Sequence, residues 1–142
     1  MSLDTSPVTI SYALKVAKEH YSKEGYAHAM RVAGYVAENM TIPKEYRDEC
    51  VCLAVMHDLC EDTNFKSTWL PDEFKKALDL LTKPKDMSYT EYCKNLRGND
   101  YTNWRMCAHW VKLADMKDHL CQKETLTDEL KVKYLEGLAE LL

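Results

Sequence analysis

The 142-residue chain has few residues that interrupt regular structure, with only four glycines and four prolines. It has no alternation of apolar and polar residues long enough to indicate a convincing β-strand. Its longest apolar runs fall far short of the roughly 20 residues that cross a lipid bilayer. Residues 1–7 are too short and polar for a secretory signal. These absences favour an all-α protein without a membrane partner, and we expect it in the cytoplasm.

Cysteine is more frequent, but its spacing lacks the signature of a zinc or redox motif. The six cysteines are Cys50, Cys52, Cys60, Cys93, Cys107 and Cys121. No two of them form a C-x-x-C pair, and several occupy apolar positions of expected helices. Free cysteine is usually buried, and cytosolic thiols stay reduced. We therefore expect reduced thiols in the core or at its boundary. A Cys–His nucleophile pair stays open as an alternative, although no spacing favours one.

Composition and charge narrow the class of ligand. The chain is 46% hydrophobic and 30% charged, with a formal net charge of -4. This length and composition predict one domain, covering residues 1–142, with a sizeable core. The negative charge argues against a binder of nucleic-acid polymers. A small phosphorylated nucleotide remains compatible, because it needs only a local cluster of cations.

Apolar residues recur with helical periodicity along the chain. The pattern predicts helices over residues 8–21, 26–40, 44–57, 72–81, 89–96, 102–122 and 127–142. We expect Gly25 to end the first helix. The helical pattern loosens over residues 58–70, and we expect a turn at residues 62–64. The expected architecture is a compact bundle of about six or seven helices. The buried face of the first helix is expected to comprise Ile10, Ala13, Leu14 and Ala17. That of the sixth is expected to comprise Met106, Trp110, Leu113 and Ala114, widened by Val111.

The most informative stretch is VCLAVMHDLCEDTNF, residues 51–65. An apolar helical run leads directly into His57 and Asp58, and Glu61 and Asp62 follow one turn later. Buried charges are costly unless they are paired or bound to a metal. A His–Asp dipeptide at a helix end can place a nitrogen and an oxygen on one divalent ion. The alternative is an ordinary helix C-terminus with a hydrogen-bonded His57 and solvated acids.

Two further residues extend this cluster. His28 lies on the second expected helix, and Asp115 directly follows the apolar positions of the sixth. The apolar faces of these helices must meet, so His28, His57, Asp58 and Asp115 can be brought together. Two imidazoles and two carboxylates suit Mn(II), Zn(II), Fe(II) or Co(II). The spacing is not that of a zinc finger.

The order H…HD…D is the motif of the HD-domain metal-dependent phosphohydrolases, and this chain resembles that family. HDLCEDT, residues 57–63, resembles the HDxxEDT of the hydrolase domain in RelA/SpoT proteins, which degrade the alarmone (p)ppGpp. HAMRVAGYV resembles the His-bearing helix of that domain, and VKLADMKDHL resembles its KLAD segment. LTKPKDMSYTEYCKNLRGND is similar to the connecting region of small stand-alone relatives. The resemblance covers about residues 10–122.

The resemblance implies an HD-type helical bundle with a defined division of labour. It implies that the metal ligands are His28, His57, Asp58 and Asp115. It further implies that Glu61 and Asp62 are the acidic pair that handles the attacking water. The implied activity is a Mn(II)-dependent 3′-pyrophosphohydrolase that releases pyrophosphate from a guanosine nucleotide.

The chain departs from the family pattern at two places that concern the substrate. The family has a longer, basic, Gly-containing segment before its first His, and residues 21–26 are a shortened version. The family also has Asn four residues after the KLAD aspartate, where this chain has His119. His119 can therefore contact the substrate or lie beside the metal.

A strongly acidic site needs cations to hold an anionic substrate. The candidates are Lys23, Arg31, Lys83, Lys85 and Lys112, and we expect Lys23, Arg31, Lys112 and His119 to bind substrate. Each lysine or arginine is equally compatible with a solvated surface charge. Tyr26, Tyr89 and Tyr92 can stack on a nucleobase, although their spacing also fits core packing.

Three functions remain open from the sequence. The first is a (p)ppGpp-type pyrophosphohydrolase. The second is an HD phosphohydrolase acting on another nucleotide or phosphoester. The third is a non-catalytic member of the fold that binds a nucleotide or a metal.

Overall fold

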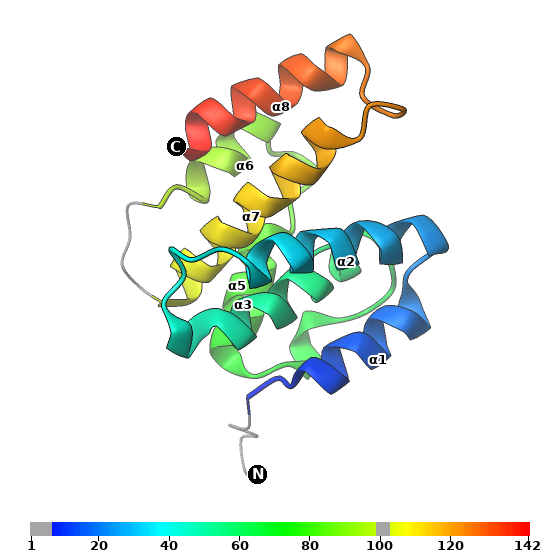
Figure 1. Ribbon diagram of the computed structural model, residues 1–142, viewed down its shortest axis with the longest axis vertical. Coiled ribbons are helices and arrows are strands. Elements are labelled where there is room, and N and C mark those ends of the chain that lie inside the picture. The colour runs from blue at the N-terminus through cyan, green and yellow to red at the C-terminus, as the bar shows by residue number, and fades with distance from the viewer. Residues whose placement is uncertain (1–6, 99–102) are drawn as a thin grey trace.

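The computed structural model describes residues 7–98 and 103–142 (Figure 1). These residues form eight α-helices and one short 3-10 helix, and they contain no strand, so the all-α prediction is confirmed for the described chain. The elements are α1 Ile10–His20, α2 Lys23–Ala37, α3 Lys44–Met56, α4 Leu59–Asp62, η1 Ser67–Trp69, α5 Asp72–Leu81, α6 Tyr89–Asn95, α7 Asn103–Cys121 and α8 Asp128–Leu141.

The junction between α1 and α2 differs from the expectation. α1 ends at His20, and only two residues separate it from α2. The hydroxyl of Ser22 caps α2 by accepting the backbone N–H of Gly25 at 3.1 Å, so Gly25 lies inside the first turn of α2. The expectation that Gly25 ends a helix was wrong. A serine N-cap stabilises a helix by about 1 kcal/mol, which offsets the roughly 1 kcal/mol that glycine costs there.

The region after α3 is more regular than expected. α3 ends at Met56, and His57 is its C-terminal cap residue. Residues 58–70 contain the short helices α4 and η1, which the loosened pattern did not predict, and the chain bends at residues 63 and 64, within the expected turn. The Thr63 hydroxyl donates to the Leu59 carbonyl and accepts the Phe65 N–H, which closes α4.

The remaining helices begin and end within about three residues of their expected bounds. α5 covers the expected residues 72–81, and the Ser88 hydroxyl caps α6 by accepting the Glu91 N–H. The Thr127 hydroxyl caps α8 in the same way through Leu130 N–H. The expected helix start at residue 102 and part of the expected break over residues 97–101 lie outside the described residues.

On α1 and α7, the buried residues differ in part from those expected. On α1, Ala13 and Ala17 are buried, but Ile10 and Leu14 are 40% and 37% exposed. Within the described part of the chain α1 packs closely on α3 alone, and the narrow stripe of Ala13, Val16 and Ala17 is enough for this contact. On α7, Ala114 is buried, whereas the other three expected residues are half-buried: Met106, Trp110 and Leu113. Val111 is buried as expected, and the other buried residues of α7 spread around the helix and include Cys107, Asp115 and Asp118.

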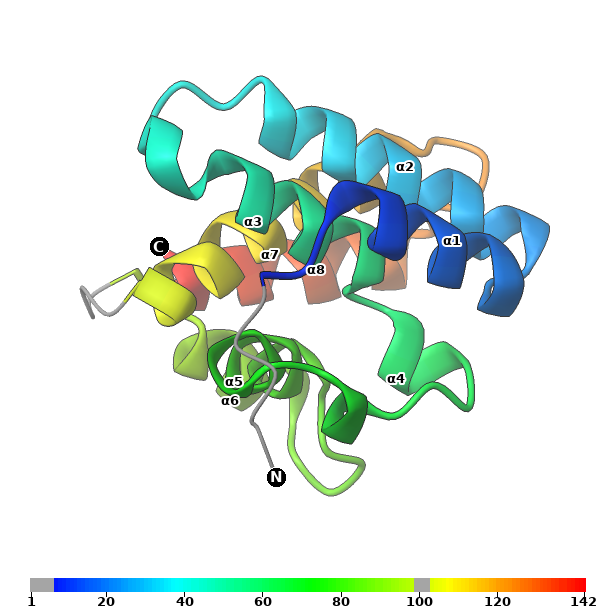
Figure 2. The ribbon, with the colours of Figure 1, turned by 90° about the horizontal axis from the view of Figure 1, so that it is seen from below.

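The position of α7 explains this spread. α7 packs against α2, α3, α5 and α8, while α1 packs on α3 and α6 packs on α8. Figure 2 shows α7 running through the middle, with α1, α2 and α3 on one side and α5 and α6 on the other. A central helix must bury polar as well as apolar positions. This arrangement brings the C-terminal half of α7 to α2 and to the end of α3.

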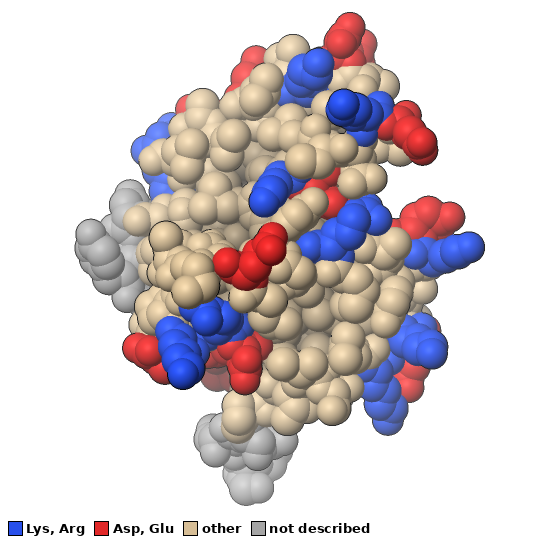
Figure 3. Space-filling view, viewed as in Figure 1, with Lys and Arg blue, Asp and Glu red and all other residues tan. Residues whose placement is uncertain are grey.

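The cysteines are free thiols in the structure, as expected. Cys50, Cys52, Cys93 and Cys107 are buried and Cys60 is half-buried, whereas Cys121 is exposed at the end of α7. Among the described residues, no helix combines the length and the apolar character needed to cross a membrane. On the face shown in Figure 3, basic and acidic side chains are interspersed.

Candidate metal centre

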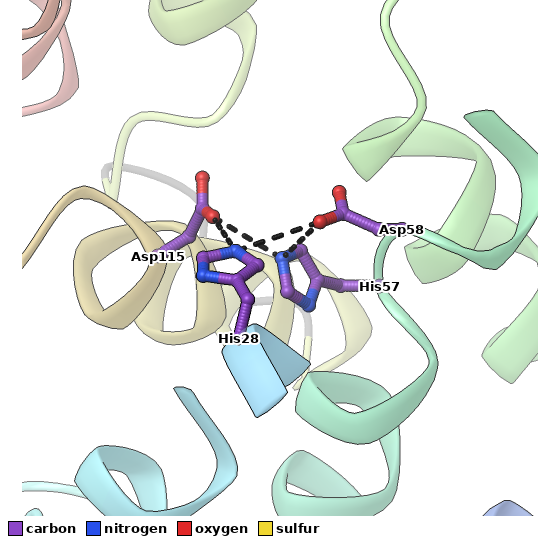
Figure 4. Close-up of side chains that lie close together, drawn as sticks. All are labelled: His28, His57, Asp58 and Asp115. Atoms are coloured by element: carbon purple, nitrogen blue, oxygen red, sulfur yellow. Dashed lines mark hydrogen bonds and ion pairs between the residues drawn. The ribbon is translucent and has the colours of Figure 1, made fainter. Parts of the chain in front are cut away.

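Four side chains from three parts of the chain converge beside α7. One ligand atom from each of His28, His57, Asp58 and Asp115 lies within 4.8 Å of the others (Figure 4). The Nε2 atoms of His28 and His57 lie 2.8 and 3.2 Å from Asp115 Oδ1. The same atoms lie 3.5 and 3.2 Å from Asp58 Oδ2. The sequence-based expectation that these four residues come together is confirmed.

The end of α3 sets the position of His57. Its Nδ1 donates to the Ala54 carbonyl at 2.6 Å. A carbonyl only accepts hydrogen bonds, so Nδ1 carries the proton. In the neutral imidazole, Nε2 then presents its lone pair to the cluster.

Tyr21 fixes the backbone of the His57–Asp58 pair. Its hydroxyl donates to the Val55 carbonyl at 2.8 Å and accepts the Asp58 N–H at 3.1 Å. These two bonds span the point where α3 stops, and they tie it to the end of α1. Tyr21 therefore holds the break that turns the Asp58 carboxylate toward His57.

His28 lies in the second turn of α2. Its Nδ1 donates to Asp118 Oδ2 at 2.6 Å, and its Nε2 faces Asp115. Both histidines of the cluster thus use Nδ1 for an anchoring hydrogen bond. Both point Nε2 inward, which is the arrangement of metal-ligating histidines.

Asp115 divides its two oxygens between different partners. Oδ2 accepts a hydrogen bond from the buried ammonium of Lys112 at 2.8 Å. Oδ1 faces His28 and His57, and also His119 Nε2 at 3.2 Å. One oxygen is therefore held by the protein, and the other is directed at the cluster.

The cluster perturbs the ionisation of its members. Burial opposes protonation of His57, but the Asp58 and Asp115 carboxylates outweigh it and raise its pKa well above 6.5. The pKa of His28 is also raised, because Asp115 and Asp118 outweigh burial. Burial opposes ionisation of Asp115, yet Lys112 and the three imidazoles hold its pKa well below 3.8. Protons on the imidazoles thus balance the carboxylates, and a cation can take that place.

The donor set fits a divalent metal ion. Buried carboxylates need a balancing positive charge, and two carboxylates match a divalent ion. Two imidazole nitrogens with two carboxylate oxygens suit ions of borderline hardness. We conclude that the group of His28, His57, Asp58 and Asp115 can bind a metal ion.

The acidic pair on α4 separates into two environments. Glu61 Oε1 accepts the backbone N–H of Lys83, which ties α4 to the loop before α6. Asp62 is exposed. Its pKa is raised, because partial burial and the charge of Asp58 outweigh the opposite effect of His57 and His28. Both carboxylates therefore lie within electrostatic reach of Asp58, and Glu61 is in addition hydrogen-bonded to the loop.

The expected substrate cations fall in different places. Lys23 is exposed at the start of α2. Lys112 is buried, and its Nζ lies over the rings of Tyr89 and Tyr92, 5.1 and 4.8 Å from their centroids. Arg31 donates from Nε and Nη2 to Asp118 at 2.8 and 3.1 Å.

Three other expected groups lie either in the loop before α6 or beside the cluster. Lys83 Nζ donates to the Pro84 and Met87 carbonyls of its own loop, and Lys85 is exposed. His119 stacks on Tyr134 with ring centroids 4.7 Å apart, and its own ring is 4.7 Å from that of His28. Of the expected substrate-binding residues, His119 and Lys112 thus both border the cluster through Asp115.

Sequence reasoning did not single out Asp118, Tyr21 or Tyr134. A signal for Asp118 was present, since it follows Asp115 by three residues and so shares its helix face. No local signal pointed to Tyr21, because its partners lie 34 and 37 residues away.

No family model matches this chain, and no curated protein matches it either.

Proposed function

We propose that this chain is a metal-dependent phosphohydrolase of the HD type, acting on a guanosine nucleotide that carries a 3′-pyrophosphate. The observation that supports it best is the convergence of His28, His57, Asp58 and Asp115 on one point. Mn(II) is the ion we propose, with Zn(II), Fe(II) and Co(II) as alternatives for the same donor set. The free thiols fit a reducing compartment such as the cytoplasm.

A bound divalent ion would polarise a phosphoryl oxygen and make a nearby water more acidic. Asp62, exposed beside the cluster, would orient that water and take its proton. The water oxygen attacks the phosphorus next to the ribose 3′ oxygen, the bond between that oxygen and phosphorus breaks, and pyrophosphate leaves. The 3′ oxygen takes a proton as it departs.

Lys112 supports an anionic substrate through its charge. The two ligand carboxylates balance a divalent ion, so the ammonium of Lys112 adds positive charge next to the ion. Burial opposes that charge, but Asp115 and the rings of Tyr92 and Tyr89 keep the pKa of Lys112 well above 10.5. The ammonium therefore remains charged at neutral pH and offsets part of the charge of Glu61.

A second candidate is hydrolysis of another nucleotide or phosphoester by the same site. Two observations favour it. Only Tyr21 and Ser22 connect α1 to α2, which leaves no basic loop in front of His28. His119 occupies the position beside Asp115 where the resembled family carries Asn. Both features alter the groups that meet the part of the substrate remote from the phosphate.

A substrate panel with purified protein tests the proposal. Metal-free protein is loaded with Mn(II) and mixed with ppGpp, pppGpp, other nucleotides and simple phosphomonoesters. We expect pyrophosphate release from ppGpp, at a rate that falls when His57→Ala replaces the wild type. Hydrolysis of another phosphoester instead would select the second candidate. Metal binding without turnover of any compound would leave a binding module and overturn the proposal of an enzyme.

A further inference from the structure

Asp118 is a second buried carboxylate of α7, and it lies outside the group of four ligands. It is 0% exposed, although it carries a charge. Its Oδ1 accepts from Arg31 Nε at 2.8 Å and from Gln122 Nε2 at 3.4 Å. Its Oδ2 accepts from His28 Nδ1 at 2.6 Å and from Arg31 Nη2 at 3.1 Å. The two oxygens of a carboxylate offer about four acceptor positions, so all are in use.

This bonding keeps Asp118 ionised. Burial opposes its charge, but the hydrogen bonds from Arg31 and His28 outweigh burial and lower its pKa. Arg31 binds it with a two-pronged guanidinium contact, the geometry that best suits a carboxylate. The contact joins α2 to α7, and Arg31 follows His28 by one helical turn. The same ion pair therefore also fixes the part of α2 that carries His28.

The two histidines of the cluster are anchored differently. His57 Nδ1 donates to a backbone carbonyl, that of Ala54. His28 Nδ1 donates to a carboxylate, which makes its Nε2 a more electron-rich donor. A carboxylate on the far side of a histidine also fixes the ring orientation and the tautomer. The anchoring of His28 therefore depends on side chains that can be changed.

We propose that Asp118, held in place by Arg31, is the positioning residue for His28 and sets how tightly the centre holds a divalent cation. This inference rests on the metal site within the proposed function and does not require hydrolysis. It gives Arg31 an indirect role, since its guanidinium serves Asp118 rather than a substrate phosphate.

The test compares Mn(II) affinity of the metal-free variants by isothermal titration calorimetry, with folding checked by circular dichroism. Loss of a partner behind a metal-ligating histidine typically costs about 10–100-fold in affinity. We expect Asp118→Asn to lose affinity in this range, because the amide is uncharged. Asp118→Glu should recover part of it, because it retains a carboxylate.

Arg31→Lys is a second variant that leaves the carboxylate in place. We expect a smaller loss of affinity, because a lysine cannot bind both oxygens in a fork. The matched controls are Glu140→Gln and Arg97→Lys, since Arg97 Nη2 and Glu140 Oε2 form an Arg–carboxylate pair at 3.0 Å outside the cluster. Both controls should bind Mn(II) as the wild type does.

Three results decide the matter. Wild-type affinity in folded Asp118→Asn would overturn the inference and leave the metal site intact. If that variant does not fold, unchanged affinity in Arg31→Lys would overturn it instead. Absence of Mn(II) binding by the wild type would overturn both this inference and the proposed function.

A nitrogen-15 spectrum of the metal-free protein adds a readout that a purely structural role would not move. At a pH where its ring is neutral, His28 should carry its single proton on Nδ1 in the wild type. Asp118→Asn should shift the tautomer or protonation state of His28 while that of His57 stays the same. Equal spectra for His28 in both proteins would contradict a positioning role.

Discussion

The ammonium of Lys112 lies 2.8 Å from Asp115 Oδ2, and the two residues are only 6% and 3% exposed. Burial alone would favour a neutral lysine, but Asp115 keeps it charged. The contact takes one oxygen of Asp115 and leaves the other facing the imidazoles. Lys112 thereby decides which atom of Asp115 is available to a metal ion.

Replacement of Lys112 by methionine should strongly destabilise the metal-free protein. Removal of one partner from a buried ion pair typically costs about 3–5 kcal/mol, because the other charge is left uncompensated. Saturation with Mn(II) should recover part of this loss, because the ion balances Asp115. Urea unfolding with and without Mn(II) measures both quantities. Lys117→Met is the control, since Lys117 is exposed and lies over the Tyr35 ring at 4.4 Å.

Chelation should lower the thermal stability of the wild-type protein. A ligand that binds only the folded state stabilises it by about 2.7 kcal/mol at 100 times its dissociation constant. His57→Ala and Asp115→Ala should lose both the metal and this response to chelator. Differential scanning calorimetry with and without a chelator gives the comparison. His20→Ala should keep the full response, since the half-buried ring of His20 packs on Phe65 instead. A full response in His57→Ala would mean that the metal site is misassigned.

The acidic pair should divide its effects between chemistry and loop position. Loss of a positioned acid–base group typically costs a factor of about 10²–10⁴ in rate. We expect such a loss for Asp62→Asn, with metal content near that of the wild type. Glu61→Gln should lose less, because the amide oxygen can still accept the Lys83 N–H. The measurements are initial rates and metal content of each purified variant. A greater loss in Glu61→Gln would exchange the two roles.

The metal-free protein should become less stable as the pH rises above 6.5. The pKa values of His28 and His57 are raised on folding, so the native state binds protons more tightly than the unfolded state. This stabilisation is full below 6.5 and is lost as the pH rises through the raised values. Metal binding displaces the same protons, so stabilisation by a fixed Mn(II) concentration should grow over that range.

Urea unfolding across this pH range, with and without Mn(II), measures the two trends. A variant with glutamine at both His28 and His57 serves as control, because neither side chain titrates. Its metal-free stability should depend much less on pH in this window. A wild-type stability that rises with pH in the absence of metal would contradict the assignment of protonated imidazoles.

Much of the local structure follows from sequence alone, because its causes lie within a few residues. Pro71 before α5, Ser88 before α6 and Thr127 before α8 each mark a helix start where the structure has one. Gly25 predicted a helix end that the structure does not have, because the Ser22 cap starts α2 and places Gly25 in its first turn. Local signals thus work until two of them compete at one position.

The cluster was also indicated by sequence, since ionisable groups next to apolar helical runs need a partner. His28, His57, Asp58 and Asp115 were selected on that ground and through the resemblance to a known family, and they lie together. Composition could not say how each group is oriented. The roles of Nδ1 and Nε2 depend on which neighbour each nitrogen meets.

Only the tertiary structure decided which charges serve the cluster and which lie at the surface. Lys112 and Lys117 are on the same helix, yet one is buried against Asp115 and the other is exposed. Asp118 contacts His28 and Arg31, which lie 90 and 87 residues earlier in the chain. Such contacts are set by how α2 packs on α7. Helical periodicity fixes the face a residue occupies, but not which face of another helix it will meet.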